Sequence, residues 1–354
     1  MRPFIPRSMK NLVTISTVAL FATVFTASSY AGTEPGYSHD SSAKTVNTDW
    51  MGALRDGTRL SELSVPGTHD TMALHWGDSV QTQSMPLDVQ LTSGIRALDI
   101  RLMFISDVLM VCHGIAFQYD SFDHVMQTTT SFLAAHPGET IIMRVGLATD
   151  TGLNKSTFDE TWKRYWNVYK GNFLKYSGDN PRLGQMRGKI VLLQDFAGDQ
   201  YGIDYDTLSA QDSYTLTTNW ELYHKWELVK SKLTSTNTVP SVCNSNNPCP
   251  VMINYLSASG GSFPYFVASG KSSPGTDASR LPTGKTTPGF SGWPDFPRVA
   301  CLGSLCTIAF EGTNNLTYEW LKEETRSRVG LVMADFPGPG LIEQIIQVNN
   351  RFRN

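Results

Sequence analysis

Two histidines, with carboxylates beside them and one arginine, are the residues of this 354-residue sequence best suited to chemistry. His69 and Asp70 follow a Pro-Gly turn, Arg101 and His113 end apolar stretches, and Asp335 ends another. A neutral histidine can take a proton from an attacking hydroxyl and a charged one can protonate a leaving oxygen, since the ordinary pKa of about 6.5 permits both states. Carboxylates fix the tautomers and guanidinium stabilises charge on phosphate oxygens. The set therefore indicates cleavage of a phosphodiester without a metal.

Short apolar stretches rich in Val, Ile, Leu or Met precede these residues and predict strands buried on both faces. They are Ile95–Arg101, Val108–His113, Thr140–Val145, Lys189–Gln194, Val251–Tyr255 and Val329–Asp335. Helix-compatible runs lie between or after them, at Met85–Thr92, Ser121–His136, Thr157–Val168, Asp212–Leu233 and Gly340–Arg351. The alternation predicts a single α/β domain, a distorted or incomplete (β/α) TIM barrel.

A barrel explains how residues far apart in sequence would meet, because the C-terminal ends of its strands share one mouth. Asp99 and Arg101 are two positions apart and share a strand face. Asp195 and Asn254 also lie at or near strand ends. Unpaired buried charges are costly, so packing alone does not explain their gathering at one end.

Each histidine taken singly is more simply a hydrogen-bonded structural residue. That interpretation is kept for the five histidines outside the set, His39, His75, His124, His136 and His224.

Composition narrows the class of protein. Charged residues make up 17% of the chain and the net charge is −3, which gives no basic footprint for nucleic acid and no polybasic membrane patch. The apolar fraction of 40% is enough for a large core. A soluble globular protein is expected.

The N-terminal residues 1–31 predict a secretory signal peptide, with three basic residues before an apolar run and small residues before the cleavage site after Ala31. An uncleaved anchor is the competing interpretation, but the run is short for a span. Residues 32–48 are polar and predicted to be flexible. The barrel domain is expected over 49–354, with an irregular surface insertion near 270–297 that is rich in Gly, Pro, Ser and Thr.

Cysteine spacing agrees with export. The close pairs Cys243/Cys249 and Cys301/Cys306 predict two local disulfides, although four cysteines allow three connectivities. Zinc is disfavoured because the intervals are not C-x2-C. Cys112 lies in an apolar stretch and is expected to be a buried free thiol. Two glycosylation patterns, at Asn154 and Asn315, matter only in a eukaryotic host.

Seven blocks of the sequence resemble, in order, those of the bacterial type of the phosphatidylinositol-specific phospholipase C X-domain family. They are residues 64–70 (SVPGTHD), 94–101 (GIRALDIR), 112–114 (CHG), 137–143 (PGETIIM), 187–193 (RGKIVLL), 211–214 (QDSY) and 328–336 (RVGLVMADF). The similarity extends from about Trp50 to Asn349 and implies a distorted TIM barrel.

The resemblance also implies roles. His69 would be the general base for the inositol 2-hydroxyl, oriented by Asp335. His113 would be the general acid, paired with Asp70, and Arg101 would bind the phosphate. Metal-dependent relatives have an acidic calcium ligand at the position of Arg101, so the resemblance implies neither metal nor cofactor.

Headgroup contacts are implied for three further residues: Asp99 would support the network, Asp212 would contact the inositol, and Tyr214 would lie under its ring. Two positions depart from the family. The family has a lysine after the strand that corresponds to residues 141–143, and this position is Gly146 here. It has an arginine after the strand that corresponds to residues 190–193, and this position is Asp195 here. These two differences leave headgroup recognition open.

Two neighbouring features bear on substrate binding. Arg144 shares a strand face with Gly146, but the sequence does not establish that it substitutes for the missing lysine. Phe263 and Phe266 resemble an aromatic rim loop that would dip into a bilayer interface, although such residues are commonly packed instead.

The leading hypothesis is a secreted, metal-independent phospholipase C that acts on phosphatidylinositol at a membrane surface and yields diacylglycerol and inositol 1,2-cyclic phosphate. A monomer is favoured. One alternative is a phosphodiesterase of the same superfamily acting on another polyol or lipid phosphodiester. Another is a secreted lipid-binding protein without turnover.

Overall fold

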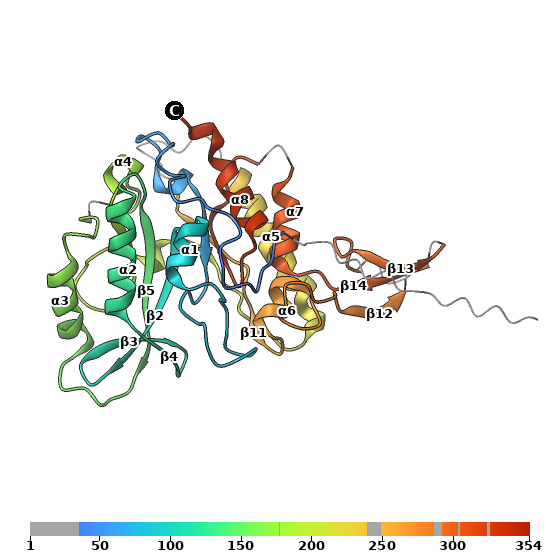
Figure 1. Cartoon of the computed structure of the whole chain (residues 1–354), viewed down its shortest axis with the longest axis horizontal. Helices are drawn as coiled ribbons and strands as arrows, with labels where there is room; N and C mark the ends of the chain where they lie inside the picture. Colours follow the sequence, from blue (N-terminus) through green and yellow to red (C-terminus); the bar gives the residue numbers. More distant parts are fainter. Residues whose placement is uncertain (1–34, 177, 239–248, 287–291, 304, 324–325) are drawn as a thin grey trace, which may run out of the picture. The chain divides into compact units, whose positions relative to one another are not determined.

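A curled parallel sheet forms the centre of the computed structural model, which describes residues 35–176, 178–238, 249–286, 292–303, 305–323 and 326–354 (Figure 1). Neighbouring strands along its main path are parallel. In spatial order they are β7 (Ile203–Asp204), β6 (Ile190–Asp195), β5 (Ile141–Asp150), β2 (Ala97–Ile105), β1 (Ser64–Thr68), β15 (Gly330–Ala334), β10 (Met252–Tyr255) and β8 (Ser209–Gln211). The prediction of a (β/α) barrel is confirmed.

The barrel is incomplete at one seam. β7 and β8 are the two ends of the path, yet they are consecutive in the chain and separated only by the 3-10 turn η2 (Tyr205–Thr207). The sheet therefore curls until its edges approach each other, and no ladder joins β7 to β8 among the described residues.

Close packing holds β1 between its neighbours. A Cβ added to Gly67 would lie 2.6 Å from the Met333 sulfur in β15 and 2.7 Å from the Ala97 Cβ in β2. Only glycine fits this approach. The residues just beyond β1 are thereby placed level with the end of β15 and with Asp99 of β2.

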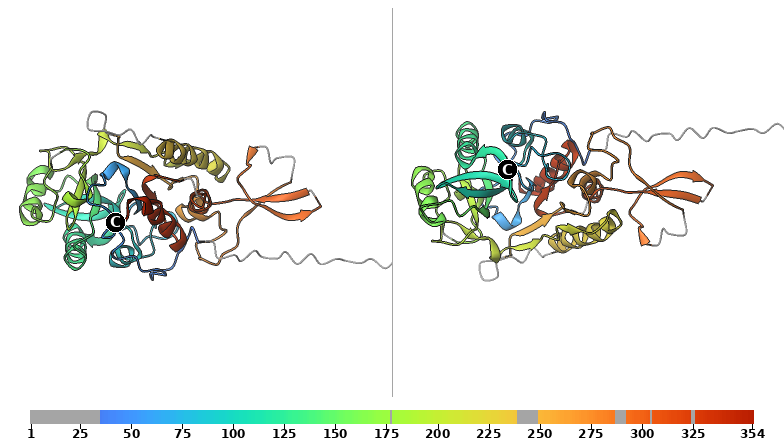
Figure 2. Two further views of the ribbon diagram at one scale, coloured as in Figure 1. Left: turned by 90° about the horizontal axis from the view of Figure 1, so that it is seen from above. Right: turned by 90° about the horizontal axis from the view of Figure 1, so that it is seen from below.

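Helices flank the strands, with α2 and α3 beyond β2 and β5 and with α5, α7 and α8 on another side (Figures 1 and 2). Their bounds are α1 (Leu87–Ser93), α2 (Phe122–Ala135), α3 (Phe158–Tyr169), α4 (Leu183–Met186), α5 (Leu222–Thr238), α6 (Pro264–Ser269), α7 (Thr313–Leu321) and α8 (Pro339–Gln347). Further 3-10 turns are η1 (Leu60–Glu62), η3 (Asn219–Glu221) and η5 (Val348–Phe352).

The buried apolar residues form two clusters, and β15 contributes to both of them. In β15, Leu331 and Met333 belong to one cluster and Val332 and Ala334 to the other. This is the alternation of a strand buried on both sides, as its continuous apolar run predicted.

The predicted strand Val108–His113 is antiparallel to its neighbour, not parallel as expected. β3 (Val108–His113) runs antiparallel to β2, pairing Val111 with Leu102, and continues through a hairpin into β4 (Ala116–Ser121). The assumption that all strands point to one mouth was wrong here. His113 reaches the level of Arg101 because the hairpin folds back along β2.

The predicted helix Asp212–Leu233 was wrong in its first part. Residues 215–216 form β9, which pairs with β11 (Ser259–Gly260), and η3 precedes the true start of α5 at Leu222. The break frees Gln211 to Tyr214 to form a loop beside the strand ends.

Residues 32–48 were predicted to be flexible, but Tyr37 within this segment is packed against the rest of the protein. It is 1% exposed, and its hydroxyl donates to the Pro274 carbonyl at 2.6 Å. Gly36 accepts a backbone hydrogen bond from Gly338. The predicted signal peptide 1–31 lies outside the described residues.

The expected irregular insertion contains regular structure. β12 (Pro282–Thr286) pairs antiparallel with β14 (Leu305–Ala309), which also pairs with β13 (Arg298–Leu302). The strand β12 was not predicted because its residues are typical of turns and because its pairing partner, β14, lies outside 270–297.

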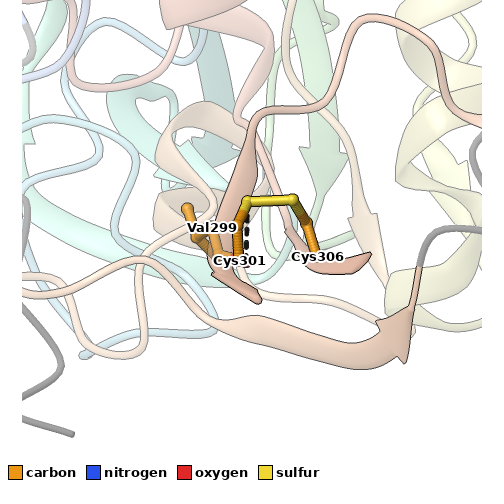
Figure 3. The surroundings of a disulfide bond; sticks show 3 residues. All are labelled: Val299, Cys301 and Cys306. Atoms are coloured by element: carbon orange, nitrogen blue, oxygen red, sulfur yellow. Dashed lines mark hydrogen bonds between the residues drawn. A yellow bond between two sulfur atoms is a disulfide. The ribbon is translucent and has the colours of Figure 1, made fainter. Parts of the chain in front are cut away.

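A disulfide joins Cys301 and Cys306 across the β13–β14 hairpin, as predicted (Figure 3). The Cys301 sulfur also lies 4.0 Å from the Val299 carbonyl. Cys243 lies outside the described residues, so its pairing with Cys249 stays a prediction. Cys112 is a buried free thiol, also as predicted. Among the described helices, none is long and apolar enough to cross a membrane.

Candidate active site

Asp70 is the centre of the charged cluster at the mouth of the barrel. It follows β1 with a left-handed backbone (φ 40°), which aspartate tolerates better than most residues. Its Oδ2 lies 3.5 Å from His69 Nε2 and 3.4 Å from His113 Nε2, and its Oδ1 lies 3.2 Å from Arg101 Nε. One buried carboxylate therefore contacts both histidines and the arginine.

His69 is oriented from the neighbouring strand. Its Nδ1 lies 2.8 Å from Asp335 Oδ1, and its backbone N–H donates to the Ala334 carbonyl. This contact arises because Thr68 and Ala334 are paired in the parallel ladder between β1 and β15. With Nδ1–H donated to Asp335, the lone pair of Nε2 faces the mouth.

His113 is oriented by a loop that the sequence did not single out. Its Nδ1 lies 2.7 Å from the Val80 carbonyl, which can only accept, so Nδ1 carries a proton. A second proton would sit on Nε2, facing Asp70. The His69 and His113 rings have centroids 6.3 Å apart at an interplanar angle of 85°.

Asp99 and Arg101 lie on one face of β2, as predicted. Arg101 donates from Nη2 to Asp99 Oδ2 at 3.0 Å. The Arg101 side chain is 25% exposed, whereas those of Asp70 and Asp99 are nearly inaccessible. The guanidinium therefore bridges two buried carboxylates at the edge of solvent.

Burial and charge set the protonation states. Burial raises the pKa of Asp70 to about 6 against the opposing effect of Arg101 and His113. Burial alone would also raise the pKa of Asp99, but Arg101 and Arg144 outweigh it and hold that pKa below its usual range. Burial lowers the pKa of His69 and raises that of Asp335. His69 is thus biased toward its neutral form.

Arg144 continues the ion pairs along the mouth. It donates from Nη1 to Asp99 Oδ1 at 3.2 Å and from Nη2 to Asp195 Oδ2 at 2.6 Å. Gly146 and Asp195 are paired between β5 and β6, and a Cβ on Gly146 would lie 3.1 Å from Asp195 Oδ2. The glycine leaves the space through which Asp195 reaches Arg144. Asp195 therefore joins the cluster through Arg144 rather than through a histidine.

Two tyrosines at the mouth were missed by sequence reasoning. The Tyr255 ring lies 5.8 Å from that of His69, its hydroxyl accepts from Arg144 Nη1 at 3.0 Å, and Tyr205 donates to it at 3.1 Å. Asn254, singled out instead, points away and donates to the Val229 carbonyl of α5. Strand alternation contains this signal, because only one of two consecutive residues faces the mouth.

The two residues expected under the inositol lie on the loop between β8 and β9. Asp212 is partly buried, and burial raises its pKa against the effect of Arg144. Tyr214 is 63% exposed. Of the expected rim aromatics, Phe263 is exposed, but Phe266 is buried in the core, so its prediction as an exposed rim residue was wrong.

The five histidines set aside have other surroundings. His39 stacks on Phe336, and His124 and His136 contact Asp120 and Asp49. Burial raises the pKa of the Cys112 thiol to about 12, so it remains protonated near the site. Within the described ranges, no group of three or more His, Cys, Asp or Glu side chains is arranged to hold a metal ion.

The fold and the cluster together define an α/β-barrel protein with two histidines and an arginine around one buried carboxylate at its mouth. The model of the phosphatidylinositol-specific phospholipase C X domain matches residues 58–195. The chain is 41% identical over 159 residues to a 1-phosphatidylinositol phosphodiesterase of Listeria monocytogenes, covering 41% of this chain and 48% of that protein. It is 30% identical over 257 residues to one of Staphylococcus aureus, covering 64% of this chain and 80% of that protein.

Solved structures agree. A phosphatidylinositol-specific phospholipase C from Listeria monocytogenes superimposes with a TM-score of 0.61 at 25% identity, over 86% of this chain and 99% of that one. One from Staphylococcus aureus gives 0.60 at 24% identity, over 87% and 99%, and supports the fold. The chain belongs to the phosphatidylinositol-specific phospholipase C X-domain family, which confirms the resemblance of the seven blocks.

Proposed function

We propose that this chain is a secreted phospholipase C that cleaves phosphatidylinositol to diacylglycerol and inositol 1,2-cyclic phosphate. The observation that carries the proposal is the placement of His69 Nε2 and His113 Nε2 on either side of Asp70 Oδ2, at 3.5 and 3.4 Å. Two imidazoles with opposite protonation, both facing one anion beside an arginine, suit an acid–base displacement at phosphorus.

His69 is the base. Asp335 holds its proton on Nδ1, so Nε2 accepts the proton of the inositol 2-hydroxyl as that oxygen attacks phosphorus. The lowered pKa of His69, caused first by burial, keeps the imidazole neutral before the attack. Asp335 then stabilises the imidazolium that forms.

His113 is the acid. The Val80 carbonyl fixes a proton on Nδ1, and the second proton, on Nε2, goes to the diacylglycerol oxygen as its bond to phosphorus breaks. Asp70 Oδ2 lies 3.4 Å from that Nε2 and can accept a hydrogen bond from it. One proton is taken and one is given, so the cyclic phosphodiester forms without water.

Arg101 binds the phosphate. It is held by Asp70 and Asp99, and its partial exposure leaves it accessible to a substrate oxygen. Because its guanidinium already compensates both carboxylates, we propose that turnover needs no metal. Asp99 positions Arg101, while Asp212, Tyr214 and Asp195 are the proposed headgroup contacts.

A second candidate substrate class is a phosphatidylinositol whose headgroup carries additional sugars. A cavity of about 510 Å³ opens beside Asp195 and is lined also by Phe196, Asp204 and Asp206. It leaves room for groups larger than inositol at the side of the mouth where Asp195 and Gly146 depart from the family pattern.

The test is turnover of phosphatidylinositol vesicles by the purified chain in EDTA, followed by phosphorus NMR. We expect activity to survive chelation and the first product to be cyclic. Acyclic phosphate as the earliest product would overturn the mechanism. Turnover only of another polyol phosphodiester would favour the related phosphodiesterase, and vesicle binding without any turnover would indicate a lipid-binding protein.

A further inference from the structure

Lys225 is a buried lysine beside the headgroup loop, and the mechanism does not use it. It lies in the first turn of α5 and is 1% exposed. Its amino group donates to the Ser213 carbonyl at 2.8 Å and approaches Gln211 Oε1 at 3.4 Å. Ser213 belongs to the loop that carries Asp212 and Tyr214, and Gln211 is the last residue of β8, directly before that loop.

The surrounding network connects this loop to the barrel. Gln211 Oε1 accepts from the Ser213 N–H at 2.8 Å, and Gln211 Nε2 donates to Asn254 Oδ1 and the Tyr255 carbonyl. Asn254 in turn donates to the Val229 carbonyl, one turn along α5 from Lys225. The loop is thereby tied to β10 on one side and to α5 on the other.

A buried lysine is costly to the fold, which calls for an explanation. Among the described carboxylates none lies within 4.0 Å of its amino group, so no ion pair compensates the charge. Burial lowers its pKa to about 7, while Asp212 on the loop and Asp335 beyond β15 oppose the shift. An apolar side chain at this place on α5 would avoid the cost, but it would leave the Ser213 carbonyl without its donor.

We propose that Lys225 is a positioning residue whose buried amino group holds the Gln211–Tyr214 loop against α5 and so orients Asp212 and Tyr214 toward the headgroup. This inference rests on the proposed function for the identity of the headgroup. Lys225 acts through the loop and touches no reacting atom. Its removal therefore affects substrate binding more than the chemical step.

Charge adds a pH dependence to this role. A protonated amine makes a stronger, charge-assisted bond to a carbonyl than a neutral amine does. Since burial lowers its pKa to about 7, Lys225 loses its proton as the pH rises through neutrality. The groups that act on its charge are Asp212 and Asp335, so their fields favour the protonated form. KM is therefore lowest below pH 7 and rises above it.

The experiment compares the full chain with Lys225→Met and with the control Lys232→Met. Lys232 lies two turns further along α5 and donates to Ser209 Oγ at 2.8 Å, outside the headgroup loop. With soluble short-chain phosphatidylinositol at pH 6.5, we expect KM to rise about tenfold in Lys225→Met, the order of one hydrogen bond, with kcat within threefold. Lys232→Met should keep both constants. The rise of KM with pH should be present in the wild type and absent in Lys225→Met.

Hydrogen exchange gives a readout that needs no substrate. The Ser213 and Tyr214 amides should exchange faster in Lys225→Met than in the wild type and in Lys232→Met. If the wild type fails to cleave phosphatidylinositol, the proposed function falls, and the exchange rates still decide whether Lys225 holds the loop. Unchanged exchange, or a loss confined to kcat, would overturn the positioning role. If Lys225→Met fails to fold, a wild-type KM that does not vary between pH 6 and 8.5 would overturn it equally.

Discussion

Strands β2 and β5 are connected by an arginine–carboxylate pair at each end of the barrel, and the two pairs differ in how completely they are satisfied. Just before the two strands begin, Arg96 donates to Glu139 at 3.0 Å. At the mouth, Arg144 of β5 donates to Asp99 of β2 at 3.2 Å. Both pairs join an arginine to a carboxylate between the same two segments, so the polar partners around them can be compared.

The Arg96–Glu139 pair is buried and fully hydrogen-bonded, and we call it the closed pair. Both side chains are inaccessible, and Glu139 Oε1 also accepts from the Gly52 N–H at 2.8 Å. Arg96 donates its remaining protons to backbone carbonyls, those of Leu91, Ile95, Asn47 and Thr48. No capacity is left for a ligand, and the pair connects the segment before β1 to the bottom of the barrel.

The cluster around Asp70 at the mouth has unsatisfied polar atoms, and we call it the open cluster. Buried oxygens Asp70 Oδ2 and Asp335 Oδ2 have no hydrogen-bond donor, and Arg101 is partly exposed. Unsatisfied buried oxygens are rare because they are costly. Ion pairing is therefore common to both ends, whereas unsatisfied buried oxygens beside a partly exposed cation distinguish the mouth from the Arg96–Glu139 pair.

The largest expected effect comes from the two histidines of the open cluster. His69→Ala and His113→Ala should each lower kcat by roughly 10²–10⁴-fold, the usual contribution of a general acid or base. A substrate whose leaving alcohol has a low pKa should restore much of the rate of His113→Ala, since its oxygen needs no proton. His69→Ala should stay slow on both substrates, because the attacking hydroxyl still has to lose its proton.

The measurement is steady-state turnover of the two substrates by both variants. Equal losses by His113→Ala on good and poor leaving groups would show that His113 is not the acid. Recovery of His69→Ala on the good leaving group would exchange the two roles. Because His69 is buried and its removal leaves Asp335 without its hydrogen-bond partner, kcat is compared per folded molecule.

A substitution that breaks the Arg96–Glu139 pair should lower the stability of the protein and leave kcat unchanged. Glu139→Ala leaves Arg96 buried without its carboxylate, which costs about 3–5 kcal/mol of unfolding free energy. Urea unfolding at pH 7 would measure this loss. The kcat per folded molecule should equal that of the wild type, and a large fall in kcat with unchanged stability would contradict the assignment of this pair to structure.

The activity of the open cluster should depend on pH through the ionisation of Asp70. Asp70 must be ionised to accept hydrogen bonds from Arg101 and His113 with its carboxylate, and its pKa is raised to about 6, chiefly by burial. We expect kcat/KM to fall about tenfold per pH unit below pH 6, as expected for a single protonation. Asp70→Asn should lack this limb and have a lower plateau.

Stability should move the other way in the same variant. A carboxyl whose pKa is raised by folding favours the folded state fully at low pH, and this contribution is lost as pH rises through about 6. Asp70→Asn avoids the loss, so its unfolding free energy should exceed that of the wild type at pH 7 and converge with it near pH 4. A variant less stable at pH 7 would show that Asp70 is compensated better than its burial indicates.

The sequence predicted the barrel and most residues of the charged cluster at its mouth because both depend on local signals. Apolar runs indicate buried strands, and a polar residue at the end of each run marks the mouth. This reasoning placed His69, Asp99, Arg101 and Asp335 correctly. Their contacts follow from strand register, which the alternation of side chains largely determines.

What the sequence did not predict depends on contacts between distant segments. The Val80 carbonyl that orients His113 belongs to a loop without a motif, and the antiparallel return of β3 is set by a hairpin rather than by apolar pattern. The loop that carries Asp212 was missed because the predicted helix was extended back over residues 212–221, where Asp, Ser, Thr and Asn are weak helix formers. Backbone acceptors and hairpin direction leave no residue-type signal, so only the structure reveals them.

The smallest expected effect tests how finely the open cluster is adjusted. A Cβ at Gly146 would lie 3.1 Å from Asp195 Oδ2 and 3.7 Å from Asp195 Cγ. Gly146→Ala should therefore push the carboxylate off Arg144 without disturbing the histidines. Asp195→Ala removes the same contact directly. Since Asp195 is partly exposed, its ion pair is worth only about 1 kcal/mol, so each substitution should raise KM about threefold to fivefold and leave kcat within twofold.

The double variant distinguishes this account from two independent effects. If Gly146→Ala acts only by displacing Asp195, the double variant should have the KM of Asp195→Ala alone, and the two free-energy changes should not add. Gly138→Ala is the matched control at the other end of β5, where an added Cβ would lie 3.1 Å from the Gly52 Cα. It should lower stability and leave KM unchanged, because the closed end binds no substrate. Additive changes in the double variant would mean that Gly146 contributes to the headgroup site by a route other than the Asp195 carboxylate, since a displaced carboxylate cannot be lost twice.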